Sequence, residues 1–260
     1  MAGRDSPDGY PCHHFVAQND TKMVEYIIAL GGQIPSGDPE STMEIFSHLQ
    51  NRWTNYVPMH TPRSRVGVSV LNGQLYAIGG YNGIERLNNV EIFDPLDQKW
   101  TPVASLSCPR SALGVAALGD KIYACGGYDG TSSSDSLECY TRENNSWKPL
   151  SKMAKPRSAL ALASLGGLIY ALGGHDGRLV CNSVERYDSL TDSWQEITSM
   201  QTKRCRFGAA VLDDKLYVAA LNSCVDRQQL PAVLGPQVHI SPMIACGAVA
   251  GAFGVYANQA

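Results

Sequence analysis

The chain has 260 residues, of which 44% are hydrophobic and 17% are charged, and its formal net charge is −3. This composition is typical of a soluble globular domain that is long enough to bury a core. With only 21 lysines and arginines and no basic run, we expect no binding to nucleic acid, because neutralising phosphates requires clustered positive charge.

Residues 1–25 are predicted to form an irregular N-terminal segment. They lack the apolar stretch of a signal peptide, so we expect no secretion. Cys12, His13 and His14 would suit a metal ion, but no fourth ligand follows at a suitable spacing, and we expect neither a metal nor a cofactor. Eight cysteines without C-x-x-C spacing favour reduced thiols and a cytoplasmic protein, with nuclear or cytoskeletal association open.

From residue 26 onward the sequence repeats with a period of 47 residues. Tandem repetition at this many independent positions predicts a series of equivalent structural units. The positions in phase are Trp53, Trp100, Trp147 and Trp194; Glu44, Glu91, Glu138 and Glu185; Arg63, Arg110, Arg157 and Arg204; Tyr76, Tyr123, Tyr170 and Tyr217; and the pairs Gly79 and Gly80, Gly126 and Gly127, and Gly173 and Gly174.

Each unit is predicted to contain four short antiparallel strands. In the first complete unit they are expected at 65–71, 74–80, 90–94 and 99–103. The Asn72-Gly73 turn between the first two is a strong hairpin signal. A sheet of this kind is apolar on both faces and buries them only by stacking on similar sheets around an axis, which predicts an all-β propeller. Units are expected near 26–58, 63–105, 110–152 and 157–199, with a partial unit at 204–220.

The residues in phase have predicted structural roles. The glycine pairs end the second strands near the axis, where a Cβ would clash or φ must be positive. The tryptophans supply apolar area between neighbouring blades. A repeated Glu or Arg buried there must be paired. Two interpretations of these charges stay open: they tie loops and blades together, or they act directly in function.

The two ends of the repeat leave the closure of the ring open. The first unit has three expected strands, at 26–30, 42–46 and 52–56, and the last has two, at 207–212 and 215–220. Either the strand at 207–212 completes the first sheet and closes four blades, or the chain is an open part of a larger ring. The tail 221–260 is expected to be non-repeat, and its apolar segment 243–257 is too short to span a membrane.

The repeated motifs resemble the kelch repeat. In phase they read RSRVG, QLYAIGGYNG, VEIFD and KW, then RSALG, KIYACGGYDG, LECY and SW, then RSALA, LIYALGGHDG, VERYD and SW. They are most similar to the kelch-like adaptors, whose six-bladed propeller presents protein substrates to a cullin-3 RING ubiquitin ligase. The resemblance implies an incomplete kelch-type β-propeller that binds a protein substrate or degron peptide. It would reach cullin-3 only through a BTB domain, which residues 1–25 are too few to form.

Strand parity locates the expected binding surface. Because antiparallel strands alternate in direction, loops between strands two and three share a face with those between strand four and the next unit. Long loops on a rigid scaffold are where function concentrates, and Tyr, Arg and His are frequent interface anchors. The candidate residues on this face are Ser64, Arg65, Ser111, Ser158, Cys205, Arg206, Tyr81, Asn82, Tyr128, Asp129, His175 and Asp176.

Arg65 and Arg206 are the sharpest candidates among them. The equivalent positions in the intervening units are Ala112 and Ala159, so the fold does not require an arginine there. Either these arginines are solvated rim charges, or they form a fork for an acidic or phosphorylated partner.

We expect no catalysis. No G-x-S-x-G nucleophile motif occurs, residues 128–135 lack the lysine of a phosphate loop, and no set of His and Tyr residues suits the copper site of kelch-type oxidases. Two non-enzymatic functions stay open: substrate recognition for a ubiquitin ligase, and an actin-binding scaffold, since some kelch proteins bind actin.

Overall fold

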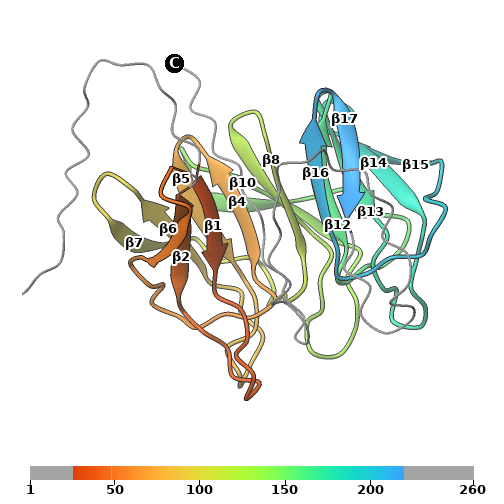
Figure 1. Ribbon diagram of the computed structural model, residues 1–260. Helices are drawn as coiled ribbons and strands as arrows, with labels where there is room; N and C mark the ends of the chain where they lie inside the picture. The colour runs from red at the N-terminus through yellow and green to blue at the C-terminus, as the bar shows by residue number, and fades with distance from the viewer. Residues whose placement is uncertain (1–25, 48, 220–260) are drawn as a thin grey trace, which may run out of the picture.

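The computed structural model describes residues 26–47 and 49–219, and within these ranges the secondary structure is entirely β (Figure 1). The N-terminal segment 1–25 and the tail from residue 220, with the apolar segment 243–257, lie outside the described residues. The strands are β1 (Tyr26–Leu30), β2 (Met43–Ser47), β3 (Arg52–Asn55), β4 (Gly67–Leu71), β5 (Gln74–Ile78), β6 (Val90–Asp94), β7 (Lys99–Val103), β8 (Gly114–Leu118), β9 (Lys121–Cys125), β10 (Leu137–Thr141), β11 (Ser146–Leu150), β12 (Ala161–Leu165), β13 (Leu168–Leu172), β14 (Val184–Asp188), β15 (Ser193–Ile197), β16 (Gly208–Leu212) and β17 (Lys215–Ala219).

Each repeat forms one antiparallel sheet in which sequence neighbours are also neighbours in space. Three sheets have four strands, β4 to β7, β8 to β11 and β12 to β15, while β1 to β3 and β16 to β17 form smaller sheets. The all-β, incomplete propeller expected from the repeat is therefore confirmed. Within the described ranges there is no helix of the length and apolarity needed to cross a membrane.

The first hairpin of each unit shows why these short segments pair as they do. Asn72 and Gly73 both have positive φ, 48° and 78°, which is the backbone of the type I′ turn that matches strand twist. The strands are shorter than the sequence predicted. The first begins at Gly67 rather than residue 65, because Arg65 has a φ of 52°, and the second ends at Ile78 because Gly79 has a φ of 60°.

The hydrophobic core lies between sheets rather than within one. One cluster joins Tyr76 and Ile78 of one unit to Ile122 and Tyr140 of the next, and the Tyr76 and Tyr140 rings meet edge to face at 5.9 Å. Trp100 is 2% exposed, and its indole N–H donates to the Val57 carbonyl of the preceding unit at 2.9 Å. Burial between blades therefore stabilises neighbouring units together.

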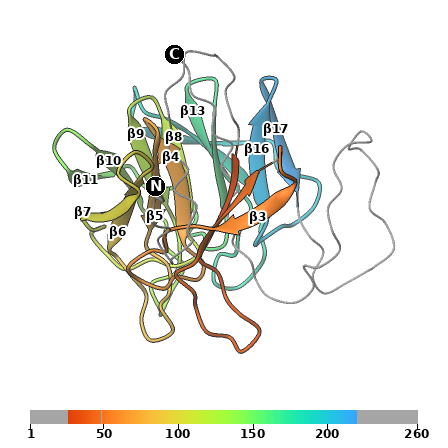
Figure 2. The same cartoon turned by 60° about the vertical axis from the view of Figure 1, so that its left-hand side comes forward.

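The first and last sheets remain separate in the part of the chain that the structure describes. The inner strands β4, β8, β12 and β16 contact one another in succession (Figures 1 and 2). Strand β16 pairs only with β17, and not with β1. Of the two alternatives for the ends, closure of four blades by the strand at 207–212 is therefore not the arrangement found. Trp53, in β3, is 47% exposed, unlike its buried counterpart Trp100.

The first glycine of each pair lies against the backbone of the next unit. A Cβ on Gly126, whose φ is +64°, would come within 2.3 Å of the Arg157 carbonyl oxygen. Gly79 and Gly173 face the equivalent carbonyls of Arg110 and Arg204 at 2.4 and 2.5 Å. Both the conformation and the close approach exclude a side chain.

We predict that Gly126→Ala destabilises the protein by about 3 kcal/mol or more, whereas Gly119→Ala costs about 1 kcal/mol. Gly119 has nearly the same φ, +62°, but no atom lies within 4 Å of its added Cβ, so it isolates the backbone strain from the clash. Urea unfolding of both variants measures the difference. Equal destabilisation of the two would contradict the close approach between units.

Candidate partner-binding face

The structure brings the predicted loops together on one face. Isolated β-bridges join Ser64 to Tyr81, Ser111 to Tyr128 and Ser158 to His175. Each bridge ties the segment that enters a unit to the loop between its second and third strands. We call this surface the loop face; it comprises the loops 81–86, 128–133 and 175–180 and the segments 64–65, 111–112, 158–159 and 205–206.

The serines on this face support its loops. Ser64 and Ser111 are buried, and their hydroxyls donate to the carbonyls of Tyr81 and Tyr128 at 3.3 and 3.2 Å. Ser158 donates to the His175 carbonyl in the same way, at 3.3 Å. These hydroxyls hold loops in place, so we assign the serines a positioning role.

The side chains of Asn82, Asp129 and Asp176 turn back onto their own loops. The Asp129 Oδ1 atom accepts the backbone N–H groups of Thr131 and Ser132, at 2.6 and 2.8 Å. These hydrogen bonds, of which the one from Ser132 has the larger effect, hold the pKa of the Asp129 carboxyl below its usual value. Asn82 and Asp176 cap their loops in the same way. The aromatic and basic side chains are left as the groups available to a partner.

Arg86 is a member of this face that the sequence reasoning missed. Its guanidinium carbon lies 4.5 Å from the Tyr81 ring centre and 5.3 Å from that of Tyr128, so one arginine stacks on tyrosines of two units. The equivalent positions are Ser133 and Val180. The comparison of repeats that singled out Arg65 and Arg206 would also have found Arg86.

Arg65 and Arg206 begin and end an arc of hydrogen bonds between units. The N–H groups of Ala112, Ala159 and Arg206 each donate to the carbonyl one unit earlier, on Arg65, Ala112 and Ala159, at 2.7–2.9 Å. All four residues have positive φ, between 51° and 55°. Burial and then the charges of Arg206 and Arg86 lower the pKa of Arg65. Arg65 is thus within electrostatic reach of both Arg86 and Arg206. Cys205 is partly buried beside Arg206.

Buried arginine–glutamate pairs lie beneath the loops. Arg63 is fully buried; its Nη2 donates to Glu91 at 2.8 Å, and its Nη1 donates to the carbonyls of Gly79 and Asn89 at 2.7 and 3.0 Å, which lie at the two ends of one loop. Arg110 with Glu138 and Arg157 with Glu185 repeat the arrangement. This geometry favours the interpretation in which the repeated charges tie loops and blades together.

The glutamate of each pair also accepts bonds from the linker that enters its unit. Glu91 accepts the backbone N–H of His60 at 2.9 Å, and Glu138 and Glu185 accept those of Ser107 and Ala154 at 2.9 and 2.7 Å. Burial alone would raise the pKa of Glu91, but the hydrogen bonds from Arg63 and His60 outweigh it and lower the pKa. The carboxylate form is therefore the one built into the structure.

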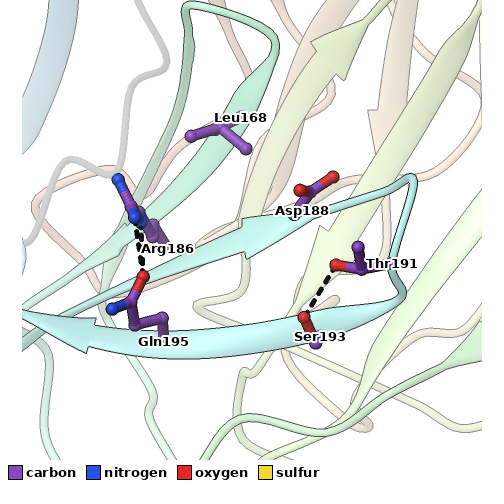
Figure 3. Close-up of a pocket in the computed structure, with 6 residues that line it drawn as sticks. All are labelled: Leu168, Arg186, Asp188, Thr191, Ser193 and Gln195. Carbon is purple, nitrogen blue, oxygen red and sulfur yellow. Dashed lines mark hydrogen bonds between the residues drawn. The ribbon is translucent and has the colours of Figure 1, made fainter.

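Three further features of the described residues lie outside the loop face. A shallow hollow on β13 to β15 is lined by Leu168, Arg186, Asp188, Thr191, Ser193 and Gln195, and Figure 3 shows Arg186 donating to Gln195 and Thr191 bonded to Ser193. Two of the Arg186 donors are thus paired with one amide oxygen of the hollow itself. Burial raises the pKa of the Cys125 thiol to about 12, which disfavours a thiolate nucleophile. No cluster of three metal-ligating side chains occurs in these ranges.

Comparison with known proteins assigns the family. The model of the KLHDC2/KLHL20/DRC7 Kelch-repeats domain matches residues 13–220, most of the chain. The chain belongs to the kelch-repeat family. This kelch-repeat chain is 34% identical over 57 residues to Kelch-like ECH-associated protein 1A of Danio rerio, which is 21% of the chain and 10% of that protein.

Two further relatives show the same pattern of short matches. Kelch-like protein 8 of Mus musculus is 37% identical over 64 residues, which is 25% of this chain and 10% of the relative. The Influenza virus NS1A-binding protein of Homo sapiens is 45% identical over 42 residues, 16% of this chain and 6% of the relative. The matched regions span about a tenth or less of these relatives' lengths.

We predict that acid weakens the wild-type protein in part through Glu91. Because its pKa is lowered in the folded state, its stabilisation is present above the unfolded pKa, near 4.3, and is lost as the pH falls through the folded value. Glu91→Gln should cost about 3 kcal/mol at pH 7, since it leaves Arg63 buried without its anion.

Denaturant unfolding at pH 7 and pH 4 measures both effects. The wild-type free energy of unfolding should fall more between these values than that of Glu91→Gln. An identical fall in the two proteins would show that Glu91 does not titrate with folding.

Proposed function

We propose that this chain is a non-catalytic protein-binding propeller whose loop face captures an acidic segment of a partner protein. The observation that carries the proposal is the convergence of Arg65, Arg86 and Arg206 on one face, at positions where other repeats have Ala, Ser or Val. The propeller fold does not need these charges, so a ligand is the simplest reason for them.

The electrostatics of the face favour an anionic ligand. None of the salt bridges in the described ranges involves these three arginines. Mutual repulsion of like charges disfavours the free state and is relieved when a carboxylate enters. Tyr81 and Tyr128 stack on Arg86, and His175 lies on the same face; side chains of these types frequently anchor protein interfaces.

We further propose that the bound segment is a degron and that the protein serves a cullin-3 RING ubiquitin ligase. The support is the family membership and the likeness to kelch-like proteins. From the succession of RSRVG, CGGYDG, GGHDG and KRCRFGAA we also propose a likeness to kelch-like protein 18. Contact with cullin-3 would run through a BTB domain. A cytoplasmic location is proposed because the five cysteines in the described ranges are all free.

We predict that Arg65→Ala combined with Arg206→Ala weakens binding of a glutamate-rich peptide tenfold or more, because each lost charge-assisted hydrogen bond costs about 1.5–3 kcal/mol. The melting temperature should stay within about 2 °C, because Ala112 and Ala159 already adopt the same backbone conformation. Titration calorimetry and thermal melts measure the two effects.

Arg142→Ala is the matched control, because it removes an exposed charge from the β10–β11 turn at the opposite end of the sheets. Unchanged peptide binding in the double variant would overturn the proposal. Co-sedimentation with filamentous actin tests the alternative, an actin scaffold; actin binding that survives the double variant would favour it.

A further inference from the structure

We propose that the loop face selects a phosphorylated side chain of its protein partner over a carboxylate, and that Arg86 is the residue that sets this preference. The proposal rests on the proposed function, because it concerns the same face. It assigns the ligand a chemical class, a phosphomonoester, and it assigns a role to an arginine outside the Arg65 and Arg206 pair.

Arg86 is held in a fixed orientation before any ligand arrives. Its guanidinium lies over Tyr81 on its own loop and over Tyr128 on the next. Both phenols are themselves fixed, since the Tyr81 hydroxyl donates to the Gly83 carbonyl at 2.5 Å and that of Tyr128 to Gly130 at 2.8 Å. A restrained guanidinium loses less conformational entropy on binding than a free one.

The edge of this guanidinium is not used by the protein. Its Nε is buried without a hydrogen-bond partner, as are those of Arg63 and Arg110, and in the described ranges its two Nη groups are likewise unpaired but not buried, so they are the donors that a ligand oxygen can reach. The nearby Asp129 carboxylate is engaged by the amides of its own loop. Arg86 therefore presents N–H donors that no described carboxylate satisfies.

The repeat shows that Arg86 is not needed to join the two loops. At the equivalent position Ser133 donates to Ser158 Oγ and to the His175 carbonyl, both at 3.1 Å. A small neutral residue thus completes the same junction one unit later. Arg86, at the junction between the loops 81–86 and 128–133, therefore adds positive charge and hydrogen-bond donors that the fold does not require.

The number of donors matches a phosphate better than a carboxylate. Tyr81 is bridged to Ser64, the neighbour of Arg65, and to Arg86, so the two arginines flank one tyrosine. Arg206 adds a third positive charge within electrostatic reach of Arg65. A phosphomonoester offers three terminal oxygens and a charge of about −1.5 to −2, whereas a carboxylate offers two oxygens and a single charge.

The test compares three blocked peptides that differ at one central position, carrying phosphoserine, glutamate or serine between aspartates, with inorganic phosphate as a fourth probe. Titration calorimetry on the full chain gives the affinities. The ¹⁵N-resolved Nε–H resonances of the arginines report directly on whether Arg86 is engaged. The variants are Arg86→Ser, which installs the residue that the next repeat carries, and the control Arg142→Ala.

We expect the phosphopeptide to bind at least about tenfold more tightly than the glutamate peptide, because it adds a charge-assisted hydrogen bond. Arg86→Ser should weaken binding of the phosphopeptide at least about tenfold more than binding of the glutamate peptide, which removes the preference, and Arg142→Ala should change neither affinity. The Arg86 Nε–H resonance should shift on saturation.

Equal affinity for the two charged peptides, or a preference that survives in Arg86→Ser, would overturn the inference. So would inorganic phosphate binding as tightly as the phosphopeptide, which would indicate an anion site without peptide recognition. If the preference is absent but the Arg65→Ala and Arg206→Ala variant still loses the glutamate peptide, the proposed function stands and the inference fails. If no peptide binds, both fail.

Discussion

The backbone carbonyl of one repeated arginine accepts a hydrogen bond from the preceding unit, and the arginine side chain holds the loop of its own unit. The Arg110 carbonyl accepts the N–H of Gly80 from the preceding sheet at 2.7 Å, and its guanidinium donates to Gly126 and to Glu138 of its own unit. A buried charge is tolerated only when it is paired and hydrogen-bonded in this way. Because the same residue fixes the junction between sheets and the base of a loop, the placement of the loop face follows from it.

Different residues stabilise the propeller and form its binding face, so the binding face can change while the fold stays the same. The residues in phase make the contacts between and within units. The first glycine of each pair leaves space for the arginine carbonyl of the next unit, and the glutamate neutralises the buried arginine of its own unit. The tryptophan donates a hydrogen bond to the previous unit. The side chains of residues that depart from the repeat take no part in these four roles. Arg65, Arg86 and Arg206 are such departures, and all belong to the loop face.

Much of the fold was predictable because the same turn, strand and tryptophan patterns recur every 47 residues. The Asn72-Gly73 turn, the apolar second strands and the phased tryptophans each favoured one four-stranded unit, and the structure has that unit. Whether the first and last sheets join depended on spatial proximity, which a sequence does not contain. The stacking of Arg86 on Tyr128 likewise depends on the neighbouring unit, so it was not predicted.

Hydrogen–deuterium exchange of the full chain, with and without the phosphoserine peptide, is the most direct test of the central claim. The claim is that the residues in phase stabilise the propeller and that the residues that differ from the repeat bind the partner. We predict that the Gly80 and Gly127 amides exchange slowly in both states, and that exchange in the loops 81–86 and 128–133 slows further when the peptide is bound. Protection concentrated instead in the strand three to strand four turns, at 95–98 and 142–145, would contradict it.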